Sequence, residues 1–393
     1  MSDVGTILPP AADDAHVTIP DVLISPETLV YVGLSSSKSA EVWDRWANWP
    51  PHGPGRETDA DDGGLQVSFI DFIIGHIRNE PDAADESDAQ WRACLQACGI
   101  ANDMQDAIMD PHFRYLRLSH SCLYWIRDTV EMRYAELQEI QRKSEHGRPV
   151  SGLQQQQQQS MAGTAPKIWS VERANATAAR DAPGYTVLYK AVDQARIAYF
   201  FDEAGVLKNI NALESRPPSD FSRNRCMFYF TPDVRVAEYS AGYAKRRSGG
   251  GSGSSIVIFC LRIPNAAIDS LAEPDIRRLH WPSDDWKELV WYSRTQQWPL
   301  PSHLRPYRDA LLIIGTKARK SHAAYRAMGS WEEVTEDCVL KVGARGELEE
   351  ATQYVISGED EGGEWLEENG DMRMYLYTRS DLDTWLTENP ASR

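Results

Sequence analysis

The sequence predicts an α+β protein with a mainly helical N-terminal domain and a strand-rich C-terminal domain. Up to about residue 147, apolar residues recur at three- and four-residue spacing, which is the pattern of amphipathic helices. From about residue 169, short apolar runs alternate with turn residues, which is typical of a many-stranded and largely antiparallel sheet. The glutamine tract Gln154 to Gln159 lies between the two regions and is typical of a linker.

These patterns divide the 393 residues into four parts. A chain of this length can form two domains with separate cores. The polar start of the chain indicates a disordered tail. The expected boundaries are 1–20 for the tail, 21–147 for the helical domain, 148–168 for the glutamine-rich linker and 169–393 for the C-terminal domain.

Charge and cysteine content limit the function classes. The net charge of −17 disfavours a general nucleic-acid-binding protein, which would present a basic face. No stretch approaches the roughly 20 apolar residues of a membrane span, and residues 1–20 lack the apolar core of a signal peptide. The six scattered cysteines do not form a disulfide framework, so we expect reduced thiols and an intracellular protein. Cys94 and Cys98 are expected in the core.

The helical half begins with a short predicted strand, Thr28 to Val32, followed by a tryptophan-bearing helix that ends before Pro50. Ser68 and Asp71 are spaced like a capping box and predict a helix over 69–77. A further helix is expected near 90–97, and a segment without an assigned structure follows at 103–109. The longest helix is expected to run from Pro111 to about Lys143 and would measure roughly 45 Å. That length is typical of a spine or of an oligomer seam, and a protein partner could bind through this half.

Histidines in the helical half do not predict a metal centre. His76, His112 and His120 lack a second ligand at the spacing that a metal site needs, so packing or capping roles are expected.

The C-terminal half is expected to contain strands at 185–189, 227–230, 256–262, 309–314, 352–356 and 372–377. An irregular or helical segment is expected from Ala191 to Asn211, and an acidic loop between the last two strands. Asp284 and Asp285 mark the start of a helix, because carboxylates stabilise the positive end of the helix dipole.

One junction stands out in this half. The apolar strand 227–230 runs into Thr231, Pro232 and Asp233, and then into a helix that should end near Arg247. Thr231 can cap this helix and Pro232 suits its first turn. The unpaired N–H groups at such a helix start can hold an anion or a nucleotide. An ordinary strand–turn–helix has the same pattern, so both interpretations stay open here.

Four pieces in a fixed order make the C-terminal half resemble the ADP-ribosyltransferase fold, which has a split β-sheet and an NAD cleft. They lie at Thr186 to Ala191, Phe228 to Tyr239, Trp286 to Gly315 and Gln353 to Ile356. The third piece has the pattern W-x-x-L-V-x-x-x-R followed by an apolar strand that ends in glycine, and it is closest to an uncharacterised bacterial and fungal branch. The resemblance covers about residues 183–382 and does not touch residues 1–150.

The resemblance implies roles for particular residues. Tyr239 would stack on the nicotinamide of NAD, Lys190 would lie beside the ribose, and Gln353 would stand where the family has its catalytic glutamate. The walls of the NAD cleft would come from positions on the first two of these strands and the junction after the second: Tyr189, Ala191, Tyr229 and Thr231.

Three of these positions depart from the family pattern. Lys190 replaces a histidine, Ala191 replaces a glycine, and Gln353 replaces the glutamate. A neutral amide cannot stabilise an oxocarbenium-like transition state as a carboxylate does, and loss of one such group typically costs about 10²–10³-fold in rate. Glu349 or Glu350 could supply the carboxylate if the register were shifted.

Two hypotheses of different classes therefore remain. In the first, the protein cleaves NAD at the nicotinamide–ribose bond and transfers ADP-ribose to an unknown acceptor. In the second, it is a catalytically inactive ADP-ribosyltransferase-like protein that binds NAD or ADP-ribose, or that serves as a protein-interaction scaffold.

Overall fold

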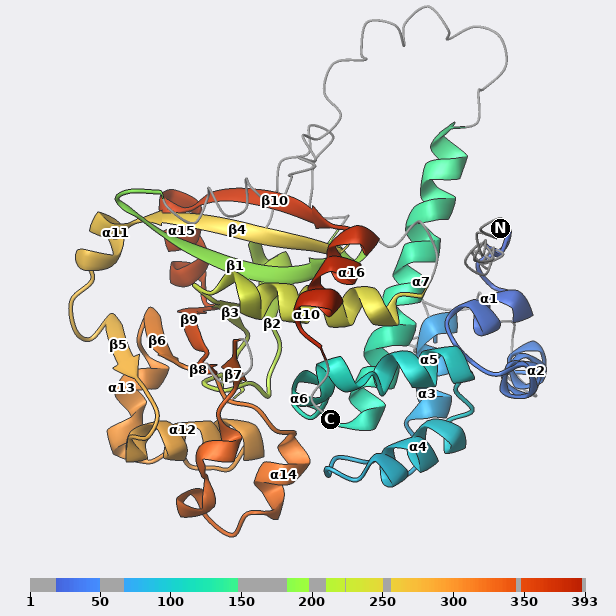
Figure 1. Ribbon diagram of the computed structural model, residues 1–393, viewed down its shortest axis with the longest axis horizontal. Coiled ribbons are helices and arrows are strands. Elements are labelled where there is room, and N and C mark those ends of the chain that lie inside the picture. Colours follow the sequence, from blue (N-terminus) through green and yellow to red (C-terminus); the bar gives the residue numbers. More distant parts are fainter. Residues whose placement is uncertain are drawn as a thin grey trace, which may run out of the picture.

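Helices dominate the N-terminal half and sheets lie in the C-terminal half, which confirms the predicted α+β class (Figure 1). The computed structural model describes residues 19–49, 67–147, 182–197, 210–222, 224–249, 256–343 and 348–390. The expected tail, apart from residues 19 and 20, and the expected linker 148–168 lie outside the described residues. The N-terminal helices are α1 (Pro26–Tyr31), α2 (Ser36–Ala47), α3 (Phe69–Ile77), α4 (Asp88–Ala97), α5 (Asn102–Ile108), α6 (Arg114–Arg117) and α7 (Cys122–Gly147).

The predicted strand at Thr28 to Val32 is wrong, because this segment is helix α1. Ser25 caps the helix: its hydroxyl accepts a hydrogen bond from the Thr28 backbone N–H at 3.2 Å, and Pro26 occupies the first turn. A serine cap followed by proline favours a helix start strongly enough to outweigh the β-branched residues of this segment.

The predicted long helix is interrupted. A 3-10 turn at Pro111–Phe113 and the short α6 are followed by a break, and α7 begins only at Cys122. In the break, the Ser119 hydroxyl donates to the Leu116 carbonyl at 2.6 Å and lies 2.8 Å from His120 Nδ1. Such local side-chain hydrogen bonds compete with helix continuation. The predicted capping of α3 is confirmed, because the Asp71 N–H donates to the Ser68 hydroxyl at 3.2 Å.

Two sheets form the C-terminal half. A three-stranded antiparallel sheet has the order β1 (Tyr185–Asp193), β4 (Ile256–Pro264) and β10 (Asp371–Tyr377). A five-stranded sheet has the order β2 (Glu214–Ser215), β3 (Met227–Phe230), β9 (Thr352–Ser357), β6 (Leu312–Thr316) and β5 (Ile276–Leu279). Its pairs are antiparallel except β5 with β6, which agrees with the prediction of a largely antiparallel arrangement. Strands β7 (Lys341–Val342) and β8 (Glu349–Glu350) form a separate pair.

The two larger sheets meet at one backbone bridge. The Tyr189 N–H donates to the Thr231 carbonyl at 2.7 Å, and the Thr231 N–H donates to the Tyr189 carbonyl at 2.9 Å. The apolar faces of both sheets enclose a core that includes Leu188, Phe230 and Phe259. The bridge therefore sets how β1 and β3 face each other.

Helices cover the outer faces of these sheets. Helix α12 packs against the five-stranded sheet, and α14 packs against α12 (Figure 1). The acidic loop predicted between the last two strands is instead helix α15, since Asp360 and Glu361 stabilise its N-terminal end. Strand β1 also continues to Asp193, beyond its predicted end. The C-terminal helices are α9 (Gln194–Ile197), α10 (Val234–Arg247), α11 (Asn265–Asp269), α12 (Asp284–Thr295), α13 (Arg305–Arg308), α14 (His322–Ala327), α15 (Asp360–Asn369) and α16 (Arg379–Glu388).

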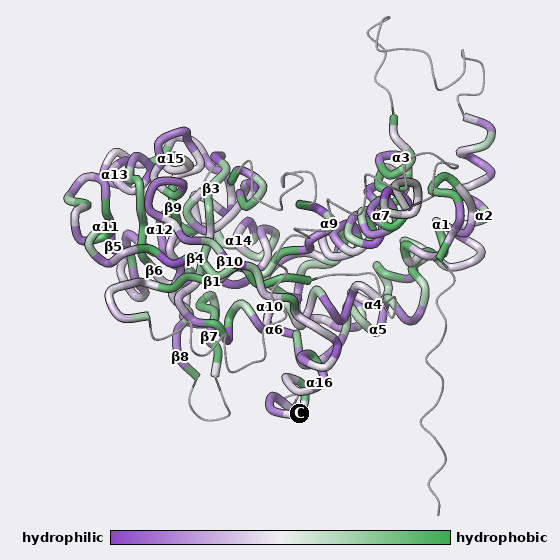
Figure 2. Tube along the Cα trace, turned by 90° about the horizontal axis from the view of Figure 1, so that it is seen from above, coloured by the Kyte–Doolittle hydropathy of each residue, from purple (hydrophilic) through white to green (hydrophobic). Residues whose placement is uncertain are grey.

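Helix α10 joins the two halves (Figure 2). It ends at Arg247, close to the predicted end, but its cap is Asp233 rather than Thr231. The Asp233 carboxylate accepts from the Arg235 N–H at 2.9 Å, so Pro232 lies before the helix. One face of α10 lies on β1 and β4, and another contacts α5 and α6. Residues of both halves therefore belong to one continuous hydrophobic core.

Ion pairs reinforce this seam between the halves. Asp128 on α7 accepts from Arg196 Nη1 and from Arg247 Nη1, each at 2.7 Å. Burial alone would raise the pKa of Asp128, but the two guanidinium groups lower it below its ordinary value. Arg133 Nε donates to the Arg247 carbonyl at 3.0 Å. The seam is thus held by charged hydrogen bonds as well as by apolar contact.

Glu136 lies in the same seam without comparable partners. Its side chain is buried, and neither carboxylate oxygen has hydrogen-bond geometry with any described residue. Burial raises the pKa of Glu136 to about 7; Tyr31, Lys245 and Arg133 oppose this rise, whereas Asp193 adds to it. A charged Glu136 therefore costs stability at neutral pH.

This pKa predicts a pH-dependent effect of Glu136→Gln. The folded protein binds the proton up to about pH 7, whereas an unfolded glutamate loses it near pH 4.5, so the free energy of unfolding falls as pH rises between these values. The Gln variant lacks this loss and should be more stable than the parent at pH 8, by about 1–3 kcal/mol. Urea denaturation at pH 8 and near pH 5.5 measures the difference, which should shrink at the lower pH.

Glu131→Gln, on the exposed side of the same helix, is the control and should not change the pH dependence. An unchanged difference between parent and Glu136→Gln at both pH values would contradict the assignment.

Candidate functional site

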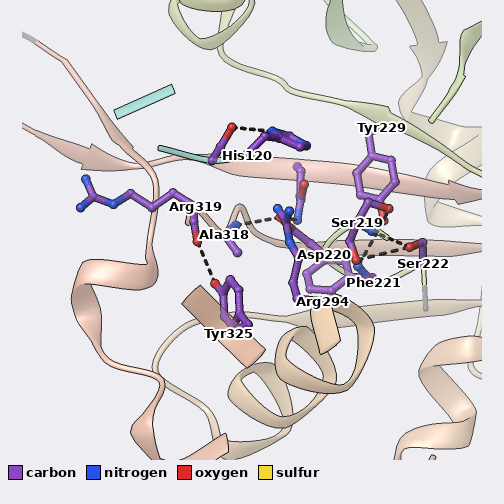
Figure 3. Close-up of polar contacts among 12 residues, drawn as sticks. His120, Ser219, Asp220, Phe221, Ser222, Tyr229, Arg294, Ala318, Arg319 and Tyr325 are labelled. Atoms are coloured by element: carbon purple, nitrogen blue, oxygen red, sulfur yellow. Dashed lines mark hydrogen bonds and ion pairs between the residues drawn. The ribbon is translucent and has the colours of Figure 1, made fainter. Parts of the chain in front are cut away.

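A buried polar cluster centred on Asp220 connects four segments of the C-terminal half (Figure 3). Asp220 Oδ1 accepts from Arg294 Nε at 2.9 Å and also from Arg294 Nη2. Asp220 Oδ2 accepts from the Ala318 N–H at 2.8 Å and from Gln353 Nε2 at 2.9 Å. We call these four residues the Asp220 cluster. They belong to the turn before β3, to α12, to the segment after β6, and to β9.

The position of Arg294 follows from how α12 is built. Ser283 caps this helix, and Asp284 and Asp285 lie in its first turn. Trp286 Nε1 donates to the Thr316 carbonyl at 2.8 Å, which fixes α12 against the end of β6. Arg294 lies in the last turn, where the negative end of the helix dipole favours a cation.

Gly315, which is the strand partner of Gln353, makes room for the neighbouring β5 backbone and for Phe221. Gly315 and Gln353 are paired across β6 and β9. A Cβ at position 315 would lie 2.2 Å from the Leu279 carbonyl oxygen and 3.1 Å from the Phe221 ring. A side chain at this position would therefore push β5 away and displace the turn that carries Asp220.

The turn that carries Asp220 is held by Tyr229 on β3. The Tyr229 hydroxyl accepts from the Phe221 N–H at 3.1 Å and from the Ser219 hydroxyl at 2.8 Å (Figure 3). The Ser219 N–H donates to Ser222 Oγ at 2.8 Å. Tyr229 therefore positions Asp220, a role different from the cofactor contact that the resemblance implies.

Further titratable groups surround the cluster. His120, from the helical half, lies over the Asp220–Arg294 pair (Figure 3), and its ring centroid is 5.8 Å from that of His322 on α14. Burial, followed by the charge of Arg294, lowers the pKa of His120 well below its ordinary value and that of His322 to about 3. Both rings are therefore neutral at physiological pH. Burial also lowers the pKa of Lys317, and Asp220 opposes this effect.

The cluster has little capacity for acid–base or nucleophilic chemistry. Four donors occupy the two oxygens of Asp220, and the side chain is buried. The Gln353 side chain is buried, and its amide carries no charge. Arg294 retains one buried donor, Nη1, without a hydrogen-bond partner among the described residues. The arrangement is suited to holding segments together.

The predicted residues of β1 lie on opposite faces of that strand. Tyr189 and Ala191 face the core shared with α10, whereas Lys190 points toward the five-stranded sheet. Lys190 Nζ donates to the Leu213 carbonyl and, at 3.0 Å, to Ser215 Oγ. Burial, followed by the charge of Lys317, lowers the pKa of Lys190 to about 7.

Among the predicted site residues, Thr231 contacts the backbone of the residue that precedes Gln353. Its hydroxyl donates to the Thr352 carbonyl at 3.0 Å and accepts from the Asp233 N–H at 3.2 Å. Thr231 also forms the bridge to Tyr189. The fold thus brings Tyr189, Thr231 and the start of β9 together.

Tyr239 lies in a different environment. It is on α10, and its ring forms a cluster with Phe113 of the helical half and Trp385 of α16, in which the three ring centroids lie 5.2 to 5.8 Å from one another. Its hydroxyl accepts from the Leu116 N–H at 3.2 Å. Burial raises the pKa of Tyr239 to about 12. The residue that the resemblance implies for nicotinamide stacking is therefore covered by protein aromatic rings.

Glu349 does not take the place of Gln353. It lies on β8, largely exposed, and its Oε2 is 2.7 Å from Arg235 Nη2. The register of β9 with β6 places Gln353 opposite Gly315, while Glu349 and Glu350 pair with β7.

Three residues of the site were given no role from the sequence. Arg294 occurs in the quoted tryptophan–arginine pattern, and that pattern is the signal that could have singled it out. No local pattern singles out Asp220, and His120 was expected only to pack or cap. No local pattern connects Asp220 with Arg294, since 74 positions separate them.

Three further findings concern possible binding sites and membrane spans. A groove of about 730 Å³ lies beside α1, and none of the predicted site residues lines it. Among the described residues, no group of three or more His, Cys, Asp or Glu side chains is arranged to hold a metal ion. In the same part of the chain, no helix combines the length and the apolar character that crossing a membrane requires.

Comparison of the chain with protein-family models, with curated proteins and with solved structures found no match.

The Asp220 cluster predicts a large effect of Asp220→Ala on stability. The substitution leaves the Arg294 guanidinium buried without its carboxylate, and breaking such a buried pair typically costs about 3–5 kcal/mol. The free energy of unfolding, measured by urea denaturation, should fall by that amount. Asp284→Ala is the matched control, because Asp284 is exposed and its ion pair with Lys287, at 3.1 Å, lies at the surface. Equal losses in the two variants would contradict a structural role for the cluster.

Proposed function

We propose that this protein is a catalytically inactive ADP-ribosyltransferase-like protein that acts as a protein-interaction scaffold. The observation that carries the proposal is the burial of Gln353 in the Asp220 cluster, where its amide donates to Asp220 at 2.9 Å. The position that would supply the catalytic carboxylate of an active enzyme is thereby committed to holding the sheet, α12 and the turn before β3 together.

The environment of Tyr239 supports the same proposal. A tyrosine that stacks on nicotinamide needs an exposed ring, but Tyr239 is only 8% exposed, and Phe113 and Trp385 pack against it. Phe113 belongs to the helical half, whose residues share one core with α10. Opening this site would separate the two halves and expose that core, which is strongly unfavourable.

Lys190 is also unsuited to the chemistry. An oxocarbenium-like transition state develops positive charge at the ribose, so a neighbouring ammonium would raise its energy. The Lys190 Nζ is engaged by Leu213 and Ser215. A scaffold does not require Gln353, Tyr239 or Lys190 to act on NAD. It does require a rigid body, which the shared hydrophobic core and the ion pairs of the seam provide.

The proposal predicts no turnover of NAD. The full chain, incubated with NAD, should release no nicotinamide above a buffer blank, as measured by liquid chromatography with an active NAD glycohydrolase as the assay control. NAD and ADP-ribose should also leave the thermal unfolding midpoint unchanged. Nicotinamide release would contradict the inactive assignment, and stabilisation by either compound would replace the scaffold with a nucleotide-binding role.

Gln353→Glu sharpens the test, because it restores the family's residue at this position. If the absence of the glutamate were the sole cause of inactivity, the Gln353→Glu variant should gain activity. Burial against Asp220 instead predicts no activity and a loss of stability of about 2–4 kcal/mol, since two carboxylates would compete for the same donors. Gln353→Met, which removes the amide without adding charge, separates the loss of the hydrogen bond from the effect of the charge.

A further inference from the structure

An apolar groove is lined by the start of the chain's described part, by α1, α5 and α7, and by Ser248 and Gly249 after α10. Its volume is about 730 Å³. Three large aliphatic side chains that line it are exposed: Ile19 by 40%, Val22 by 59% and Val30 by 48%. Such grouping of exposed aliphatic residues is unusual on the surface of a soluble domain and marks interaction sites. We call this groove the α1 groove.

Charged residues give the α1 groove a negative character. Asp21, Glu27 and Asp103 line it and are exposed. The one guanidinium in its lining, Arg133, is buried and already engaged: it donates to the Arg247 carbonyl at 3.0 Å and lies 4.0 Å from Asp103. The lining therefore presents three carboxylates and no exposed cation.

The buried carboxyl of Glu136 lies behind this lining. It neighbours Tyr31 and Arg133, both of which line the groove, and its oxygens have no hydrogen-bond partner among the described residues. When ionised, it adds to the negative potential near Tyr31. Apolar and acidic groups thus occur together in one groove.

We propose that the α1 groove binds a peptide segment of a partner protein in which apolar side chains are flanked by lysine or arginine. This inference rests on the proposed scaffold function and names the chemistry of its partner. The aliphatic side chains of the peptide would cover Val22 and Val30, and its cations would face Glu27 and Asp103. Apolar burial provides affinity, while charge complementarity selects the partner and speeds association.

Charge and composition argue against the two segments of this chain that adjoin the groove residues Ile19 and Gly249. Residues 1–18 contain Asp3, Asp13 and Asp14 and no lysine or arginine. The glycine- and serine-rich residues 250–255, which follow the groove residue Gly249, carry neither charge nor large apolar side chains. A second copy of the chain has the same net charge of −17, so its approach is opposed by repulsion.

Three synthetic peptides of about 16 residues, each labelled with fluorescein, test the proposal by fluorescence anisotropy with the full chain. The first is an amphipathic leucine–lysine peptide, the second replaces lysine with glutamate, and the third replaces leucine with serine. We expect the leucine–lysine peptide to bind at least about tenfold more tightly than either of the others. Equal affinity for the leucine–glutamate peptide would overturn the proposal.

Variants locate the binding site. The double variant Val22→Lys and Val30→Lys should weaken binding of the leucine–lysine peptide at least about tenfold, because it removes apolar surface and adds like charge. Ile24→Lys is the matched control: Ile24 is 47% exposed on the same segment but does not line the groove, and its substitution should change affinity less than about twofold. Similar losses in both variants would place the peptide elsewhere.

Glu27→Gln with Asp103→Asn tests the charge contribution. This double variant should bind the leucine–lysine peptide about three- to tenfold more weakly than the parent, and its affinity should depend less on salt concentration. Glu41→Gln, on the exposed face of α2, is the control. An unchanged affinity and salt dependence would show that the carboxylates of the groove do not select the ligand.

Other occupants give distinct results. If a chain that lacks residues 1–18 binds the leucine–glutamate peptide more tightly than the leucine–lysine peptide, the groove is an intramolecular site and the proposal fails. A concentration-dependent dimer in sedimentation velocity that the double lysine variant abolishes would assign the groove to a second copy, which also overturns it. The scaffold assignment is tested separately, because it fails if the protein releases nicotinamide from NAD. Failure of the peptide-binding proposal can therefore be distinguished from failure of the scaffold assignment.

Discussion

The buried ion pair between Asp220 and Arg294 is the interaction on which the sheet half depends. Asp220 accepts hydrogen bonds from α12, from the segment after β6 and from β9, although it lies in the turn before β3. A charge removed from water is strongly unfavourable unless donors replace its hydration, so each of these segments needs the others in place. The close approach that Gly315 permits allows the turn to reach its partners.

The same constraint explains why the site has structural rather than reactive character. Four donors occupy the oxygens of Asp220, and the Gln353 amide that supplies one of them is not available to a substrate. The backbone bridge between Tyr189 and Thr231 then fixes the two sheets relative to each other. Polar groups that suggest catalysis in the sequence are thus engaged in holding strands and turns.

The two halves of the chain are mutually dependent through α10. This helix lies on β1 and β4 with one side, while Phe113 and α6 cover another side, where Tyr239 is stacked. Charged hydrogen bonds from Asp128 to Arg196 and Arg247 extend the contact. A seam with this much buried apolar and polar surface favours a single rigid body.

Local sequence patterns were sufficient for the α+β class, for most helices and strands, and for caps such as Ser68, because these depend on residues within one or two turns of each other. They failed where local preferences conflict, as in α1 and at the break near Ser119, where capping and side-chain hydrogen bonds outweighed propensity. The partners of Gln353 and Tyr239 were decided only by the tertiary structure. Asp220 lies 133 positions from Gln353, and the Leu116 N–H donates to the Tyr239 hydroxyl across 123 positions, so no periodicity or motif could connect them.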